Sequence, residues 1–199
     1  MRGRLNNGPV PDYQVARNNA EWPDHVLRAN VTGALIASTA PTDVIDPACG
    51  DGSIVMAAHH LRAIQHATLF DISGPSVEIL RERQQNRRNE DIPEDWRIER
   101  SSIEDALGDG SYDLIVLTEI LEHLEDPDAI LRLARQRAIR LVASSPEMRP
   151  GQIDDNPEHL WMFDGEGYEE MLRTAGWTGV QKTHLAFRSM YNFQIWVCS

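Results

Sequence analysis

The stretch from Val44 to Ile54, which reads VIDPACGDGSI, constrains this chain more than any other. Its pattern predicts a buried strand that ends at Asp46, a tight turn at Gly50 and Gly52, and a helix that begins at Ser53. Glycine has no Cβ and tolerates positive φ, so such a turn lets the backbone approach a ligand closely. Open α/β sheets bind their ligands at the carboxyl ends of the strands. The stretch therefore predicts a ligand site at the edge of a parallel sheet.

Two nucleotide-binding motifs do not fit this turn. The dinucleotide fingerprint needs a third glycine, but Gly50 and Gly52 are followed by Ser53, Ile54 and Val55. The P-loop needs a Gly-Lys-Ser/Thr sequence, which does not follow the turn either. An NAD-dependent dehydrogenase is therefore the weaker interpretation.

Composition narrows the class of protein. A chain of 199 residues suits one domain with a real core. It has neither an apolar run of the ~18 residues that a membrane span needs nor a signal-peptide pattern over residues 1–7. Cys49 and Cys198 lack metal-type spacing, which predicts a reducing, cytoplasmic setting. The net charge of −12 argues against a broad nucleic-acid surface without excluding a local basic patch.

From residue 43 onward the predicted strands and helices alternate, which is typical of a mostly parallel sheet. The predicted strands are residues 43–46, 67–71, 96–101, 112–118 and 139–144. Between them we expect helices over 53–64, 75–89 and 127–137 and a short turn near 103–107. A polar segment (146–157), a helix (165–175) and two closing strands (177–187 and 191–198) follow. Before residue 43 we expect helices over 13–21 and 24–38, with residues 1–12 irregular or draped over a site.

The glycine turn resembles motif I of the class I S-adenosylmethionine-dependent methyltransferases, an acid followed by x-G-x-G-x-G. Ala48 stands at the first glycine position of that motif. The resemblance implies an α/β, Rossmann-like sheet of seven mostly parallel strands, with helices on both faces and a C-terminal antiparallel hairpin. It also implies S-adenosylmethionine as cofactor and S-adenosylhomocysteine as product. The implied cofactor contacts in and before the turn are Asp46, Ala48, Cys49, Gly50 and Gly52.

Three later strand ends continue the resemblance. Asp71 ends the second predicted strand, where a carboxylate can accept both ribose hydroxyls, and Ile72 would lie against the adenine. Ser102 stands where the family has an acid that contacts the adenine amino group, so either its hydroxyl or Glu104 would make that contact. Ile103 would offer its backbone N–H to the ring. Thr118 ends the fourth predicted strand and completes the implied cofactor contacts.

The segment after that strand carries the candidate catalytic residues. Glu119, Glu122 and His123 fall at i, i+3 and i+4, which places them on one face if the segment is helical. They resemble the E-x-L-E-H-L segment of small-molecule O- and N-methyltransferases. His159 lies in a segment that resembles the family's E-H-x-x-x-F loop over the acceptor. His123 or His159 is the candidate base, oriented by Glu119 or Glu122.

The sequence thus predicts a methyltransferase that acts on an oxygen or nitrogen of a small molecule. Residues 1–40 and the irregular loop over 146–164 would form the acceptor side, and residues 41–199 are the predicted cofactor-binding domain. Trp22, Trp161 and Phe163 would be walls of the acceptor site. Two alternatives stay open. Glu119, Glu122, His123 and His159 resemble the metal ligands of RNA 3′-end 2′-O-methyltransferases, and Ala48 and Ser102 leave room for a non-catalytic nucleoside-binding domain. The acceptor and the oligomeric state cannot be read from the sequence.

Overall fold

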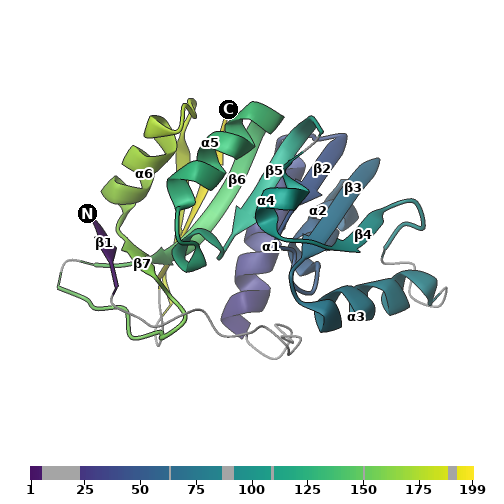
Figure 1. Ribbon diagram of the computed structural model, residues 1–199, viewed down its shortest axis with the longest axis horizontal. Helices are drawn as coiled ribbons and strands as arrows, with labels where there is room; N and C mark the ends of the chain where they lie inside the picture. The colour runs from purple at the N-terminus through teal and green to yellow at the C-terminus, as the bar shows by residue number, and fades with distance from the viewer. Residues whose placement is uncertain (6–22, 63, 87–91, 109, 150, 188–191) are drawn as a thin grey trace. The chain divides into compact units, whose positions relative to one another are not determined.

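The structure, a computed structural model, describes residues 1–5, 23–62, 64–86, 92–108, 110–149, 151–187 and 192–199 (Figure 1). The chain divides into two compact units, residues 13–116 and residues 1–12 with 117–199. The predicted helix over 13–21 and the predicted wall residue Trp22 lie outside the described residues. None of the helices in the described part is long and apolar enough to cross a membrane.

Seven strands form one sheet in the order β4-β3-β2-β5-β6-β9-β8. In the unit of residues 13–116, β2 pairs in parallel with both β3 and β5, and β3 pairs in parallel with β4. This order confirms the predicted Rossmann-like, mostly parallel sheet. The strands of this part are β2 (Asp43–Asp46), β3 (His66–Asp71), β4 (Arg97–Arg100) and β5 (Tyr112–Thr118).

The helices of the same unit begin where the sequence signals predicted. They are α1 (Pro23–Ser38), α2 (Ser53–Leu61), α3 (Gly74–Gln85) and the single turn α4 (Ile103–Ala106). Ser73 accepts a hydrogen bond from the N–H of Ser76 and so acts as the N-cap of α3. The second helix ends three residues earlier than predicted, because the backbone at Arg62 is extended.

Helices α1 and α2 are in close contact at Gly33. A Cβ built at Gly33 would lie 2.7 Å from the Cβ of Ala57 and 2.9 Å from the backbone nitrogen of Ala58. Real carbon atoms do not approach this closely, so only glycine fits between the two helices here. The close approach brings α1 onto the helix that follows the glycine turn.

Gly33→Ala is expected to destabilise the protein, although helix propensity alone predicts a gain of about 1 kcal/mol. Overpacking of a well-packed contact costs about 1–3 kcal/mol and outweighs that gain. Urea unfolding of Gly33→Ala and of the exposed control Asn30→Ala measures the difference, and the control should be neutral or slightly stabilised. Adding Ala57→Gly to Gly33→Ala should restore part of the loss. A stabilised Gly33→Ala would contradict the contact.

In the unit that contains residues 117–199, three strands pair antiparallel with one another. They are β6 (Ala138–Glu147), β9 (Asn192–Cys198) and β8 (Gln181–Leu185), with β9 in the middle. The predicted closing hairpin is therefore confirmed. Its first strand begins later than predicted, because residues 177–178 have other partners. The N–H of Trp177 donates to the carbonyl of Leu172, and Thr178 exchanges backbone hydrogen bonds with Ser199.

Two helices of this unit have acidic N-caps. Asp126 accepts a hydrogen bond from the N–H of Ala129 at the start of α5 (Pro127–Arg137), as predicted. Asp164 does the same for Gly167 at the start of α6 (Gly165–Thr174). Tyr168 on α6 is fully buried and stacks on Trp196 of β9 with the ring centroids 6.0 Å apart.

A second, two-stranded sheet joins two segments that were predicted to be irregular. β1 (Arg2–Arg4) pairs antiparallel with β7 (Trp161–Phe163), and Figure 1 shows the two strands side by side. The Arg2 guanidinium lies 4.2 Å from the centroid of the Trp161 ring and binds Asp128 at 2.6 Å. The expectation of irregular structure was therefore wrong for residues 2–4 and 161–163. Strands this short depend on contacts with distant residues, which no local pattern reveals.

Candidate functional site

The glycine turn that follows β2 has open space beside it. Gly50 has φ of +56°, in the left-handed region that favours glycine, and a Cβ built there would meet nothing within 4 Å. The N–H of Gly50 donates to Oδ2 of Asp71 at 2.8 Å. The turn is therefore tied to the end of β3 while its outer side stays accessible to a ligand.

Asp71 supports the turn with one oxygen and the next helix with the other. Its Oδ1 accepts a hydrogen bond from the N–H of Ser73 at 2.8 Å, and the residue is half-buried. Each carboxylate oxygen has two lone pairs, so both can accept a further hydrogen from a ligand. Ile72 is 57% exposed, which leaves its apolar side chain available to a flat ring. This geometry is compatible with the predicted contact to a ribose.

Asp46 is a buried carboxyl at the end of β2. Its pKa is raised to about 8, mainly by burial and also by the carboxylates of Asp71 and Asp51, while a hydrogen bond from the N–H of Ala48 opposes the rise. A positive charge placed near Asp46 would lower this pKa and favour the ionised carboxylate. Without such a charge, the folded protein holds a proton on Asp46 at neutral pH.

Asp46→Asn is expected to weaken the dependence of stability on pH. The pKa of about 8 in the folded state lies above the usual 3.8, so the folded protein holds a proton that the unfolded chain releases. This proton stabilises the fold fully below about pH 4, and the contribution is lost as the pH rises to about 8. Asparagine has no proton to lose. Urea unfolding measures the free energy of unfolding at about pH 5 and about pH 8. Between these two pH values the wild type should lose at least about 1–2 kcal/mol more than the variant does.

The control Glu99→Gln, at a side chain that is 42% exposed, should keep the wild-type fall in stability. An Asp46→Asn variant with the same pH dependence as the wild type would contradict the assignment of this proton to Asp46.

The remaining predicted residues of the turn are held by the protein itself. The N–H of Ala48 donates to Oδ1 of Asp46 at 3.2 Å, and the N–H of Cys49 donates to the carbonyl of Phe70 at 2.8 Å. Burial raises the pKa of the Cys49 thiol well above its usual value, so this thiol is unreactive. Gly52 has φ of +72° and packs against Leu80, where a Cβ would come within 3.0 Å.

Ser102 acts as the N-cap of α4. Its hydroxyl oxygen accepts a hydrogen bond from the N–H of Asp105 at 3.1 Å, and the residue is half-buried. Ile103 is buried, whereas Glu104 is exposed. The serine hydroxyl can still donate its hydrogen to a ligand, because capping uses only the oxygen lone pair.

The other predicted residues belong to the second unit, where Thr118 is buried at the end of β5. The expectation that Glu119, Glu122 and His123 share one helical face was wrong. Leu121–His123 is a single 3₁₀ turn, and Glu119 precedes it with φ of +53°. The N–H of Glu119 donates to the carbonyl of Ser144, whose hydroxyl donates to Oε1 of Glu119 at 2.7 Å. Glu119 is therefore directed to β6.

Glu122, His123 and His159 come together in this unit. One potential ligand atom from each of the three lies within 4.8 Å of the others. The two imidazole rings meet edge to face, with centroids 4.7 Å apart. Glu122 and His159 are buried and His123 is half-buried, so His123 is the most accessible of the three. The set matches the predicted catalytic group with Glu119 left out, and we call it the Glu-His-His cluster.

Each histidine of the cluster has a fixed partner on its Nδ1. His123 Nδ1 lies 2.9 Å from the carbonyl oxygen of Glu158, and His159 Nδ1 lies 2.6 Å from Oδ2 of Asp154. Such partners fix the tautomer and the orientation of a ring whose other nitrogen binds a proton or a metal. Asp154 was missed by sequence reasoning. An acid in a polar loop that holds several others carries no signal that marks it as the partner of a histidine.

Of the two described aromatic residues predicted to line the acceptor site, Phe163 lies in the core instead. Phe163 is 1% exposed and meets Tyr168 edge to face with centroids 5.3 Å apart, so it belongs to the core. Trp161 is half-buried, and its Nε1 donates to the carbonyl of Leu124 at 2.8 Å.

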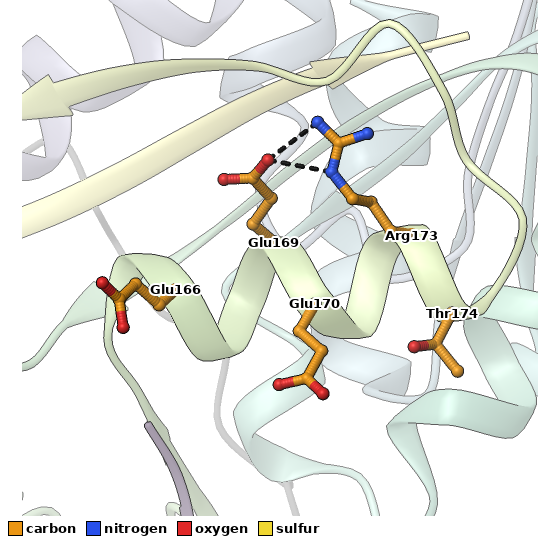
Figure 2. A pocket seen from close by; sticks show the side chains of 5 residues that line it. All are labelled: Glu166, Glu169, Glu170, Arg173 and Thr174. Atoms are coloured by element: carbon orange, nitrogen blue, oxygen red, sulfur yellow. Dashed lines mark hydrogen bonds and ion pairs between the residues drawn. The ribbon is translucent and has the colours of Figure 1, made fainter.

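Two hollows on the surface of this unit lie away from the Glu-His-His cluster. One, of about 500 Å³, lies along α6, where Arg173 binds Glu169 at 2.8 Å. Figure 2 shows the side chains that line it. The other, of about 490 Å³, contains Glu147 with Lys182 and His184 as ion-pair partners. Neither is lined by a residue of the Glu-His-His cluster.

Comparison with solved structures gives the same fold in methyltransferases. A protein from Nostoc punctiforme PCC 73102 that carries the name O-methyltransferase matches with a TM-score of 0.72 at 17% identity, over 90% of this chain and 57% of its own. This chain thus spans little more than half of that protein's length. Magnesium protoporphyrin IX methyltransferase from Synechocystis PCC 6803, with bound S-adenosylmethionine, matches at 0.67 and 16% identity, over 94% and 86%.

The methyltransferase domain of bacterial CtHen1-C also matches, at a TM-score of 0.67 and 18% identity, over 87% of this chain and 97% of its own. At such identities these likenesses concern the fold alone. No curated protein matches the sequence. A methyltransferase domain family, however, matches residues 16–182. With the glycine turn and the strand order, this match shows that the chain belongs to the class I S-adenosylmethionine-dependent methyltransferases.

Proposed function

We propose that this enzyme transfers the methyl group to an oxygen or nitrogen of a small-molecule acceptor, and that His123 takes the proton of the acceptor. The observation that carries the proposal is the contact between His123 Nδ1 and the carbonyl of Glu158 at 2.9 Å. A carbonyl only accepts, so the ring proton stays on Nδ1 and Nε2 keeps its lone pair. His123 is also more accessible than His159. Of the two predicted bases, we therefore favour His123.

The residues of the first unit fit the cofactor chemically. S-adenosylmethionine supplies a methyl group on a positively charged sulfonium and carries a ribose and an adenine. Asp46, Asp51 and Asp71 would favour the positive charges, Asp71 would accept the ribose hydroxyls, and Gly50 would allow close approach. The proposed contacts of Ile72, Ser102 and Ile103 complete this set, and the contact of Thr118 stays a prediction.

The reaction is a displacement that depends mainly on positioning. The acceptor atom bonds to the methyl carbon, the carbon–sulfur bond breaks with its electron pair left on sulfur, and S-adenosylhomocysteine leaves. The acceptor proton passes to Nε2 of His123. The buried carboxylate of Glu122 stabilises the resulting imidazolium, because an opposite charge nearby favours the charged form.

A small-molecule acceptor is supported by two observations. Solved structures with this fold include one named for magnesium protoporphyrin IX and one of the EvdMO1 N-terminal domain in the presence of D-fucose. The net charge of −12 gives no electrostatic attraction to a polyanion. Residues 1–40 as an acceptor-side segment, and a cytoplasmic location suggested by the two free cysteines, are parts of the same proposal.

The second candidate is a metal-dependent 2′-O-methyltransferase acting on RNA 3′ ends. It is favoured by the Glu-His-His cluster, whose three ligand atoms lie within 4.8 Å and whose histidines both have Nδ1 partners, as metal-binding histidines usually do. Two contacts oppose it. Glu119, the fourth predicted ligand, bonds Ser144, and the Asn156 amide lies 3.0 Å from His159 Nε2.

An acceptor screen with and without metal tests the proposal. Purified enzyme is incubated with labelled S-adenosylmethionine and pools of hydroxyl- and amine-bearing small molecules, or with short RNAs, in EDTA or in Mn²⁺. We expect a labelled small molecule in EDTA. Labelling confined to RNA 3′ ends and dependent on Mn²⁺, with loss in Glu122→Gln, would overturn the proposal in favour of the second candidate.

A further inference from the structure

Asp154 and His159 form a buried hydrogen-bonded pair in the loop that precedes β7. Oδ2 of Asp154 lies 2.6 Å from Nδ1 of His159, and the two side chains are 1% and 6% exposed. A carboxylate can only accept a hydrogen bond, so the ring carries its proton on Nδ1. The pair is well shielded from solvent, and water does not compete for either partner.

Asn156 indicates the same tautomer independently. Its Oδ1 accepts a hydrogen bond from the N–H of Glu158 at 3.0 Å, which fixes the orientation of the amide. The Nδ2 end therefore faces His159 and lies 3.0 Å from Nε2. An amide NH₂ can only donate, so Nε2 must present its lone pair. Two partners on opposite sides of the ring thus require the proton on Nδ1.

The carboxylate of Asp154 is itself held in place by the loop. Its Oδ1 accepts a hydrogen bond from the N–H of Asn156 at 3.0 Å. The N–H of His159 donates to the carbonyl of Asn156 at 3.2 Å, and the N–H of Leu160 donates to the carbonyl of Glu122 at 2.7 Å. The last of these bonds connects the loop to the 3₁₀ turn that carries the other two cluster residues.

We infer that Asp154 is the positioning residue of His159: it keeps the ring proton on Nδ1 and presents the Nε2 lone pair within the Glu-His-His cluster. The inference deepens the proposed function and rests on it, because the His159 ring that Asp154 orients meets the ring of the proposed base His123 edge to face, with centroids 4.7 Å apart. Any acceptor hydrogen or cation that His159 binds takes the place of the Asn156 amide. Asp154 acts only through the imidazole.

The tautomer can be measured without an acceptor. Long-range proton–nitrogen NMR spectra of the imidazole rings, recorded at about pH 8 where a histidine is ordinarily neutral, distinguish a proton on Nδ1 from one on Nε2. The His159 signals are assigned by their loss in His159→Gln. We expect the Nδ1–H pattern in the wild type and its loss in Asp154→Asn. The matched control Asp155→Asn, an exposed neighbour, should keep the wild-type pattern.

An Nε2–H pattern in the wild type, or an unchanged pattern in Asp154→Asn, would overturn the inference. The wild-type spectrum decides the question even if the variant folds poorly, and binding of S-adenosylmethionine shows whether it folds. Once an acceptor is known, Asp154→Asn should lower the methylation rate by about 10–100-fold. A correct tautomer in an enzyme that methylates no small molecule would refute the proposed function and leave this inference standing.

Discussion

Asp71→Ala is expected to lower the affinity for S-adenosylmethionine by about 100-fold. The carboxylate would accept hydrogen bonds from both ribose hydroxyls, and a bond to a charged group contributes about 1.5–3 kcal/mol. Isothermal titration calorimetry with S-adenosylmethionine and S-adenosylhomocysteine measures the loss. Both ligands carry the same ribose, so both should lose affinity by a similar factor.

The substitution also removes two bonds within the protein. Asp71 accepts hydrogen bonds from the N–H groups of Gly50 and Ser73, each at 2.8 Å, so the glycine turn loses its support. Asp71→Asn separates the two effects in part, because its carbonyl can still accept one of the two bonds, such as that from Gly50, while the charge and the second bond are lost. We expect Asp71→Asn to lose less stability than Asp71→Ala and to bind with intermediate affinity.

Glu99→Gln is the control for Asp71, since Glu99 lies on the neighbouring strand β4 and its side chain is 42% exposed. It should bind both ligands as the wild type does. Unchanged affinity in both Asp71 variants would contradict the ribose contact and with it the proposed cofactor site.

His123→Ala is expected to reduce the methylation rate by about 10²–10⁴-fold, the usual contribution of a general base. The variant loses the Nε2 lone pair that would take the acceptor proton. Affinity for S-adenosylmethionine should change little, because the proposed cofactor contacts are other residues. The rate is measured by the release of S-adenosylhomocysteine with the acceptor that the screen identifies.

His184→Asn is the matched control for His123. It removes a histidine that pairs with Glu147 in the same unit and should leave the rate unchanged. A raised pH should recover part of the His123→Ala rate, because the acceptor then ionises without help. A wild-type rate in His123→Ala would refute the assigned role and turn attention to His159.

The sequence by itself determined the glycine turn, the strand before it and several helix starts. The strand that ends at Asp46, the turn at Gly50 and the start of α2 at Ser53 were all predicted and are present. The same holds for Asp71 at the end of β3 and for Asp126 as the N-cap of α5. These features depend on residues that are neighbours in the chain, so hydrophobic period, glycine and capping residues identify them.

Only the tertiary structure decided the composition of the Glu-His-His cluster. His159 joins His123 through a loop whose Glu158 carbonyl contacts a residue 35 positions earlier, and Asp154 enters as a partner that no motif marked. Glu119 leaves the predicted set, because a positive φ and a bond to Ser144 direct it to β6.

Gly33 shows that local sequence signals are also insufficient in the core. Helix propensity alone favours alanine at this position, but the contact with Ala57 leaves no room for its Cβ. The physical reason is common to these cases. Local propensities act between residues close in sequence, whereas the positions of loops and the distances between packed helices depend on contacts between residues far apart in the chain.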